Sequence, residues 1–425
     1  MKVFGVTFGK KPVLFAIFIL ICLGGFLRWL SLRESIARSP DEYIYSYQAR
    51  TVAVSGLAGI KSLVKEYNSN QQLWIYPPPT RIGYYGILAG VMKLSGVSHV
   101  KQGAYLSVFF SILSFLVFSL IGIRFFNPWV TLYGLLFLSV SFADIAVSIR
   151  TWQDAFLAFL GGGLIYFSCS IISSPERKKN YFFLAGIGTY CLLIKESGVV
   201  IYGLCVAWIL WVLFREKKLF PRGMFLSAAY LLSILFAFLL MAALTGGIGV
   251  LTGILKHVKD AMPTNSYGVV YQSGPIWYFL QEFILVSPLS AFFFVFSLLA
   301  ILLPARFTGR FQVSPSAFES KIVGGMIFFV IAFFLVAAIV PYSQNLRYIS
   351  AVFLPFYLVS GFGFWKMVLL LRSFFDKRFQ AAIILFLFFT VVGIGAVSDF
   401  MNFRKLFLMT DCLDLSVKMV RECLR

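Results

Sequence analysis

Long apolar stretches alternate with short polar ones through almost the whole 425-residue chain. The stretches at 12–31 and 223–245 have the length of about 20 residues that an α-helix needs to cross a bilayer. Repetition of this pattern predicts an all-α polytopic membrane protein of about eleven spans. The predicted spans are residues 12–31, 103–123, 128–147, 153–173, 181–196, 198–214, 223–245, 279–304, 323–341, 348–370 and 379–397.

The composition supports lipid as the main solvent of the chain. Hydrophobic residues make up 60% of it and charged residues only 13%, too few to cover a soluble domain of this size. The net charge of +20 comes from basic residues in short loops between apolar stretches, which favours a topological signal over a nucleic-acid partner. We expect residues 1–397 to form one transmembrane module and 398–425 to form a short C-terminal tail.

The stretch at 82–96 is the one ambiguous span, and the distribution of charge decides its status. If it does not span, the basic clusters at 177–179 and 217–218 share a side with the lysines of the N-terminus, as cytoplasmic loops require. If it does span, those clusters move to the outer side. We therefore predict that 82–96 is an amphipathic helix on the outer interface. The outer loops are then 32–102 and 246–278, with short turns between the later spans.

The first outer loop contains Ser39-Pro40-Asp41-Glu42, which has two interpretations. One is a helix start with Ser39 as N-cap, Pro40 in the first turn and Glu42 as the reciprocal capping partner. In that interpretation the side chain of Asp41 contributes only a favourable interaction with the helix dipole. The other is that Asp41 is a general base, held rigidly at the membrane surface to accept the proton of a hydroxyl group.

Other polar residues interrupt apolar stretches on the predicted outer side. Arg150 and Asp154 are four apart and could pair on one helix face, while Lys195-Glu196 and Arg347-Tyr348 lie where spans begin or end. Each alone is explained by side chains that reach from a span to the interface. Because all of them fall on the same side as Asp41, they favour a functional site.

Metal ligation has a weaker basis. The six cysteines include no CxxC pair, so a structural zinc site is not predicted. His257 is one of two histidines and lies in the second outer loop. A lone histidine there is either a polar loop residue or one ligand of a divalent metal.

Several short motifs follow one another along residues 12–370. They are Asp41-Glu42-x-x-Tyr45 with Ala49-Arg50, Pro77-Pro78, Arg150-x-x-x-Asp154-Ala155, Leu193-Ile194-Lys195 with Ser197-Gly198, His257, Gly274-Pro275-Ile276-Trp277-Tyr278 and Arg347-Tyr348. In this order they resemble the polyprenyl-phosphate-sugar-dependent glycosyltransferases of the GT-C fold. That family includes protein O-mannosyltransferases and the aminoarabinose transferases that modify lipid A.

The resemblance implies a GT-C-like bundle with periplasmic juxtamembrane helices in a bacterial inner membrane. It implies inverting transfer of a sugar from a polyprenyl-phosphate donor to a hydroxyl of a lipid-linked or glycan acceptor on the periplasmic face. Asp41 matches the general base, Asp154 matches the second acidic position, which supports the acceptor or donor site, and Lys195 and Arg347 match phosphate-binding positions. Glu42, beside Asp41, is the other catalytic candidate. Besides Lys195 and Arg347, the substrate-binding candidates are Tyr45, Tyr76, Arg81, Arg150, Asp154, Glu196 and Tyr348.

The sequence departs from this family at Ile75-Tyr76, where aminoarabinose transferases place Glu-Lys. The glutamate belongs to their metal site and the lysine to their phosphate site, so His257 lacks its metal-binding partner. Arg81 is the candidate replacement for the lysine. The short tail favours a lipid or glycan acceptor over a protein. A protein O-glycosyltransferase of the same fold, a lipid or solute transporter and an inactive scaffold are the alternatives.

Overall fold

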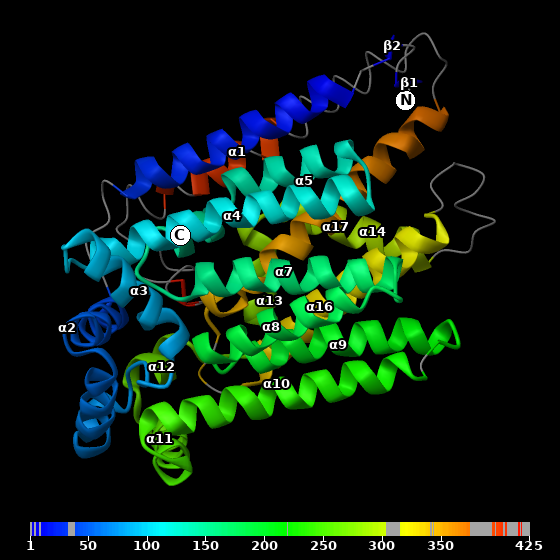
Figure 1. Ribbon diagram of the computed structural model, residues 1–425. Helices are drawn as coiled ribbons and strands as arrows, with labels where there is room; N and C mark the ends of the chain where they lie inside the picture. Colours follow the sequence, from blue (N-terminus) through cyan, green and yellow to red (C-terminus); the bar gives the residue numbers. More distant parts are fainter. Residues whose placement is uncertain are drawn as a thin grey trace.

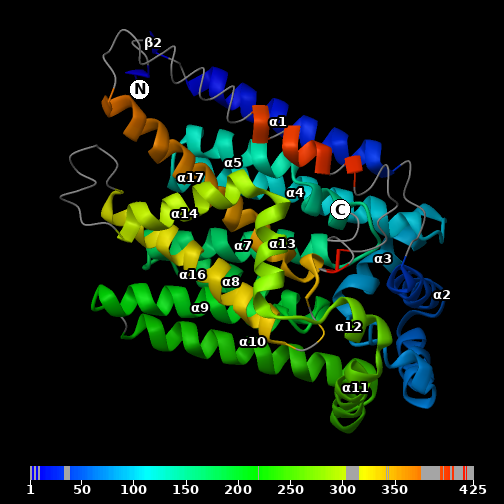
Figure 2. The same cartoon turned by 180° about the vertical axis from the view of Figure 1, so that it is seen from behind.

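The structure is a computed structural model in which the long helices lie side by side (Figure 1). The helices α2, α3, α11 and α12 gather at one end of this bundle, and the view from behind shows the same arrangement (Figure 2). We call this end the site end. The structure describes residues 2–3, 6–7, 10–32, 39–218, 220–302, 315–340, 342, 344–374, 393–395, 397–402, 404–405, 415–416 and 418.

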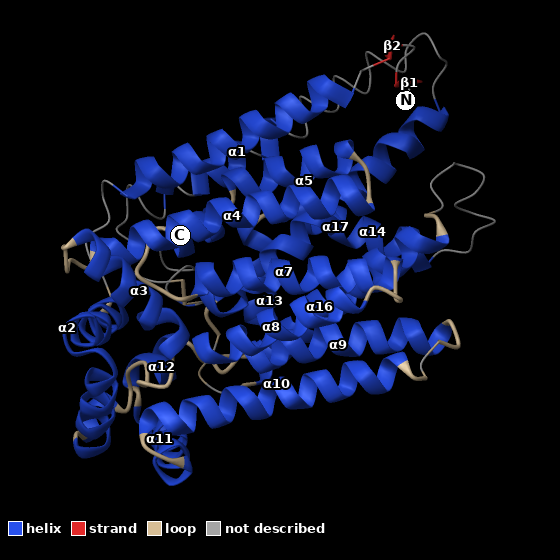
Figure 3. Ribbon diagram, viewed as in Figure 1, coloured by secondary structure: helices blue, strands red, loops and turns tan. Residues whose placement is uncertain are grey.

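Helices account for nearly all of the described chain (Figure 3). A short antiparallel pair, β1 (Lys2–Val3) and β2 (Val6–Thr7), precedes them. The helices are α1 (Lys10–Leu32), α2 (Pro40–Ser69), α3 (Ile82–Ser95), α4 (Lys101–Phe125), α5 (Pro128–Val140), α6 (Phe142–Ser148), α7 (Asp154–Ser173), α8 (Lys178–Ile194), α9 (Gly198–Arg215), α10 (Arg222–Thr245), α11 (Ile248–Ala261), α12 (Ser266–Tyr271), α13 (Ile276–Val286), α14 (Pro288–Leu302), α16 (Ala317–Ile339) and α17 (Ser350–Phe374), with 3-10 turns η1 (Gln71–Leu73), η2 (Met262–Thr264) and η3 (Leu346–Ile349).

The multi-pass membrane architecture predicted from the apolar stretches is confirmed. Within the described ranges, 7 helices are long and apolar enough to cross a membrane, or up to 9 if each of two bent pairs is one span. The bent pairs are α5 with α6, which meet at 62°, and α13 with α14, which meet at 108°. Helix α8, of 17 residues, covers most of the predicted span 181–196. The predicted span 379–397 lies almost entirely outside the described residues, so the number eleven stays a prediction.

Apolar side chains on the outside of the bundle are consistent with contact to lipid. Helix α10 is the clearest case, because a row of large hydrophobic residues along it faces outward. In water such a continuous apolar surface would drive association, whereas lipid tails solvate it. The exposed residues of this row are Leu231, Leu232, Leu235, Phe236 and Leu239.

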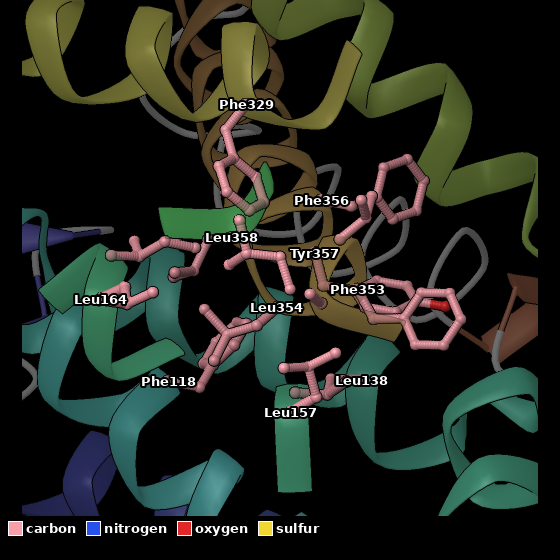
Figure 4. Close-up of a cluster of buried hydrophobic side chains, with 14 of the residues drawn as sticks. Phe118, Leu138, Leu157, Leu164, Phe329, Phe353, Leu354, Phe356, Tyr357 and Leu358 are labelled. Carbon is pink, nitrogen blue, oxygen red and sulfur yellow. The ribbon is translucent and has the colours of Figure 1, made fainter. Parts of the chain in front are cut away.

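Helix α17 lies in the middle of the bundle and carries much of the core. Its buried Phe353, Leu354 and Leu358 pack against Phe118 of α4 and Leu164 of α7 (Figure 4). A glycine pair brings α17 against α5: a Cβ at Gly361 would lie 2.6 Å from the carbonyl oxygen of Val130 and 2.7 Å from the nitrogen of Gly134. Small residues allow such close helix contact in membranes, where packing replaces the hydrophobic drive of water.

The break between α5 and α6 is held by a buried ion pair. Arg28 of α1 is fully buried, bonds to the carboxylate of Asp144 and donates to the hydroxyl of Ser111 at 2.8 Å. It also donates to the carbonyl oxygens of Ser139 at 3.2 Å and Leu138 at 3.3 Å, at the bend. Backbone carbonyls freed at a break need donors inside a membrane, and this arginine supplies them. The bend directs the chain into the turn before α7, which carries part of the site.

The stretch at 82–96 forms α3, a helix of 14 residues that is too short to cross a bilayer. It ends at Gly96, whose φ of +68° is the left-handed conformation that a helix C-cap favours. The predicted non-spanning helix is thus present. It is more enclosed than an interfacial helix would be, because Tyr84, Tyr85 and Leu88 are fully buried against neighbouring helices.

Candidate active site

Helix α2 begins where the capping signal predicted. Ser39 has an extended backbone, Pro40 occupies the first turn, and the backbone N–H of Ser39 donates to Oε1 of Glu42 at 3.2 Å. Glu42 does more than cap the helix. Its carboxylate also accepts from Nη1 of Arg150 at 3.2 Å and from the backbone N–H of Thr151 at 3.1 Å. This buried side chain therefore fastens the turn before α7 to the start of α2.

The carboxylate of Asp41 pairs with a residue that is distant in the sequence. Its Oδ2 accepts from Nη2 of Arg347 at 2.7 Å, and Arg347 lies in η3, just before α17. The guanidinium of Arg347 lies over the ring of Trp152 at 4.7 Å and beside the ring of Tyr348 at 4.9 Å. The predicted general base and one of the predicted phosphate-binding residues thus form an ion pair.

Asp154 and Lys195 form a second ion pair, with Nζ of Lys195 donating to Oδ1 of Asp154 at 2.6 Å. Both side chains are buried, and Nζ of Lys195 lies 4.3 Å from the ring centre of Tyr348. The expected pair of Arg150 and Asp154 on one helix face is wrong. Helix α7 begins at Asp154, so Arg150 stands in the preceding turn and reaches Glu42 instead.

Arg81 joins the first outer loop to the turn between α8 and α9. It donates from Nη2 to Oε2 of Glu196 at 2.9 Å, from Nε to Oε1 of Glu196 at 3.3 Å, and from Nη1 to the hydroxyl of Tyr45 at 2.6 Å. The two charges support each other, because Glu196 and then Tyr45 raise the pKa of Arg81, and Arg81 lowers the pKa of Glu196. Both groups stay charged at neutral pH.

These contacts gather most of the predicted site residues in one place. We call the eight charged residues the paired cluster, since they form four ion pairs at the site end. Tyr348 connects two of the pairs, because Lys195 and Arg347 both lie against its ring. The paired cluster consists of Asp41, Glu42, Arg81, Arg150, Asp154, Lys195, Glu196 and Arg347.

Two predicted residues lie apart from the paired cluster. Tyr76 is half-buried and, within the described part of the chain, has no side-chain hydrogen bond to the cluster. His257 of α11 stacks on Trp74, with ring centres 3.8 Å apart and planes 12° apart. The described residues contain no group of three His, Cys, Asp or Glu that could hold a metal ion. His257 therefore joins α11 to the first outer loop, and these residues do not fit a metal centre around it.

Trp152 is a site residue that the sequence did not single out. It is buried, its ring lies beneath Arg347, and its Nε1 donates to Oγ of Ser39 at 3.2 Å. A tryptophan face over a guanidinium adds a cation–π attraction and holds the cation in place. The feature of the sequence that could have pointed to Trp152 is its position between Arg150 and Asp154.

The turn that carries Arg347 is tied to two other segments of the chain. The backbone N–H of Leu346 donates to the carbonyl oxygen of Leu415 at 2.9 Å, and that of Gln344 donates to the carbonyl oxygen of Gln272 at 3.1 Å. Asn345 pairs with Ser416 in an isolated antiparallel bridge. Parts of the loop 246–278 and of the C-terminal tail thus position the arginine.

No family model and no curated protein matches this sequence, but solved structures share its fold. ArnT from Cupriavidus metallidurans bound to undecaprenyl phosphate has a TM-score of 0.60 at 15% identity, over 96% of this chain and 75% of that chain. Its apo state has a TM-score of 0.58 at 15% identity, over 96% and 76%. The Archaeoglobus fulgidus oligosaccharyltransferase has a TM-score of 0.56 at 11% identity, over 92% of this chain and 56% of that longer chain. The chain therefore has the GT-C fold that these membrane glycosyltransferases share.

Proposed function

We propose that this protein is an inverting membrane glycosyltransferase that moves a sugar from a polyprenyl-phosphate donor to a hydroxyl group. The observation that carries the proposal is the paired cluster at one end of a GT-C bundle. There a partly exposed carboxylate, Asp41, lies among cations that come from distant parts of the chain. The similarity to a fold whose solved member binds undecaprenyl phosphate supports the donor class.

The proposed role of the cations is to stabilise the leaving group. When the bond between the sugar and the phosphate breaks, the departing phosphate gains negative charge, and positioned cations stabilise that charge in the transition state. Lys195, Arg347 and Arg81 are suited to this task, since the arginines offer planar donors and the lysine a compact charge. The similarity of Lys195 and Arg347 to phosphate-binding positions supports the same assignment.

Asp41 serves the acceptor. Its carboxylate takes the proton of the acceptor hydroxyl while the hydroxyl oxygen attacks the anomeric carbon. The bond between that carbon and the phosphate oxygen breaks on the opposite face, which inverts the configuration. Polyprenyl phosphate leaves with the bonding electrons, and the proton remains on Asp41 until water removes it.

The acceptor is proposed to be a lipid-linked sugar or glycan on the periplasmic side of a bacterial inner membrane. The charge distribution supports this side, because the basic clusters then lie in the cytoplasm. A transporter is less favoured: transporters place their binding residues near the middle of the membrane, whereas the paired cluster lies at one end of the bundle (Figure 1).

Mass spectrometry of the lipids that copurify with the protein tests the donor class. We expect polyprenyl phosphate or its glycosylated form with the wild type, and about tenfold less with Arg347→Gln, which removes a charge-assisted contact. Arg215→Gln is the matched control, because Arg215 is exposed at the far end of α9. Absence of such lipids from the wild type, or equal amounts in all three proteins, would contradict the proposal.

The binding of the phosphate should also depend on pH through Lys195. Burial, the largest cause, lowers the pKa of Lys195, and Asp154 opposes this effect. The charge that attracts phosphate is present below the lowered pKa and is lost as pH rises through it. We expect the binding of undecaprenyl phosphate to weaken as pH rises into the alkaline range. The midpoint of this loss should lie below about 10.4, the pKa of an ordinary lysine. In Lys195→Arg this loss should move to higher pH, since arginine stays charged; an unmoved profile would refute the role of Lys195.

A further inference from the structure

The paired cluster has balanced charge. Its four cations and four anions form four ion pairs, with N–O distances of 2.6 to 3.2 Å. Within the described residues, each cation that we assign to the donor phosphate therefore already has a carboxylate partner. A phosphate that binds at the cluster therefore competes with these carboxylates for the cations.

The burial of the pairs indicates which two stay closed. The pair Arg150–Glu42 has side chains only 4% and 3% exposed, and Lys195–Asp154 only 8% and 1%. Separating such buried partners would leave a charge without compensation, which is strongly unfavourable. These two pairs hold the turns of the site together and stay closed, so Lys195 attracts the phosphate while it remains paired with Asp154.

The two more accessible pairs, Arg81–Glu196 and Arg347–Asp41, differ in the geometry of their contacts. Arg81 bonds to both oxygens of Glu196 and also to Tyr45, which gives it a two-pronged, geometrically defined contact. Asp41 meets Arg347 through Oδ2, at 2.7 Å, and its side chain is 22% exposed. Arg347 itself is held from below by Trp152, so the arginine can stay in place while its carboxylate partner moves away.

We propose that the donor phosphate displaces Asp41 from Arg347 and that this displacement releases the base for catalysis. The inference rests on the proposed function and adds an order of events to it. In the free protein the guanidinium holds Oδ2, so the carboxylate is fixed to Arg347 and only its other lone pairs can face an acceptor hydroxyl. When the phosphate takes over Arg347, Oδ2 becomes available to the acceptor hydroxyl. When polyprenyl phosphate leaves, Asp41 returns to Arg347, so Oδ2 is available to an acceptor only while a donor is bound.

Equilibrium binding of undecaprenyl phosphate to the full-length protein in nanodiscs tests this competition. In Asp41→Asn the neutral amide no longer competes for Arg347, so we expect binding about fivefold tighter than in the wild type. Asp41→Ala should show the same gain, which separates lost competition from a new contact made by the amide. Thermal unfolding of each variant checks that it is folded.

Glu66→Gln is the matched control, since it also removes one negative charge from α2, while Glu66 accepts from the hydroxyl of Tyr47 and, among the described residues, forms no ion pair with the paired cluster. General electrostatic attraction would tighten binding in both Glu66→Gln and Asp41→Asn, whereas displacement at Arg347 tightens it in Asp41→Asn alone. Unchanged or weaker binding in folded Asp41 variants, or an equal gain in both, overturns the inference. If the wild type does not bind undecaprenyl phosphate at all, the proposed function fails instead.

Discussion

Asp41→Asn is expected to lower the rate of sugar transfer by about 10²- to 10⁴-fold, the usual contribution of a general base. Asparagine keeps the size of the side chain but cannot accept the acceptor proton. Because Asp41 is partly exposed and Glu42 makes the capping contact, the substitution should leave the fold intact. The measurement is the release of polyprenyl phosphate under single-turnover conditions, together with the unfolding temperature.

Glu42→Gln provides the contrast for Asp41. Glu42 is buried and holds both Arg150 and the backbone of Thr151, so its substitution should lower stability as well as activity. Asp41→Asn should lower activity alone. An Asp41→Asn protein that transfers sugar at the wild-type rate would refute the assignment of the base.

Lys195→Met is expected to destabilise the protein by about 3–5 kcal/mol, the range measured when one partner of a buried ion pair is removed. Asp154 is 1% exposed, and within the described chain its Oδ2 has no hydrogen-bond donor. Without Lys195 it would be a buried carboxylate that has lost its ion-pair partner. The free energy of unfolding in mixed micelles measures this effect.

The double variant Asp154→Asn with Lys195→Met separates structure from function. Removing both charges should restore most of the lost stability, because no buried charge is left unpaired. Transfer should stay low, since the cation that stabilises the leaving phosphate is gone. Recovery of transfer along with stability would show that the pair is only structural.

The local features of this fold were predictable because they depend on neighbouring residues. A span is a property of about 20 consecutive side chains, and the capping signal at Ser39–Glu42 is complete within four residues. Both are present in the structure. The charge distribution likewise indicated that 82–96 does not span, and α3 is too short to do so.

The partners within the site could not be predicted in the same way. Asp41 and Arg347 are 306 residues apart, and Arg81 and Glu196 are 115 apart, so only the packing of helices decides that they meet. The expected pair of Arg150 and Asp154 failed because Arg150 lies in the turn before α7, so the two residues do not share a helix face. The sequence indicated that the polar site residues lie together on one side of the protein. Which of them form ion pairs became clear only from the structure.

Residues that act through tertiary contacts had no distinct signal. Arg28 and Asp144 lie within the predicted spans 12–31 and 128–147, and the sequence did not indicate that together they support the bend between α5 and α6. Leu415 holds the turn of Arg347 through a backbone carbonyl, a contact to which its side chain gives no clue. His257 matched a metal position by order along the chain, and its stack on Trp74 became visible only in three dimensions.

The most direct test of the glycosyltransferase assignment is the release of polyprenyl phosphate by protein reconstituted in liposomes. The donor is a mixture of polyprenyl-phosphate sugars, and the acceptor is lipid-linked glycan from a bacterial envelope. We predict that the wild type releases polyprenyl phosphate only when acceptor is present and that Asp41→Asn releases none above background. No release from any such donor, or equal release by Asp41→Asn, would contradict the account.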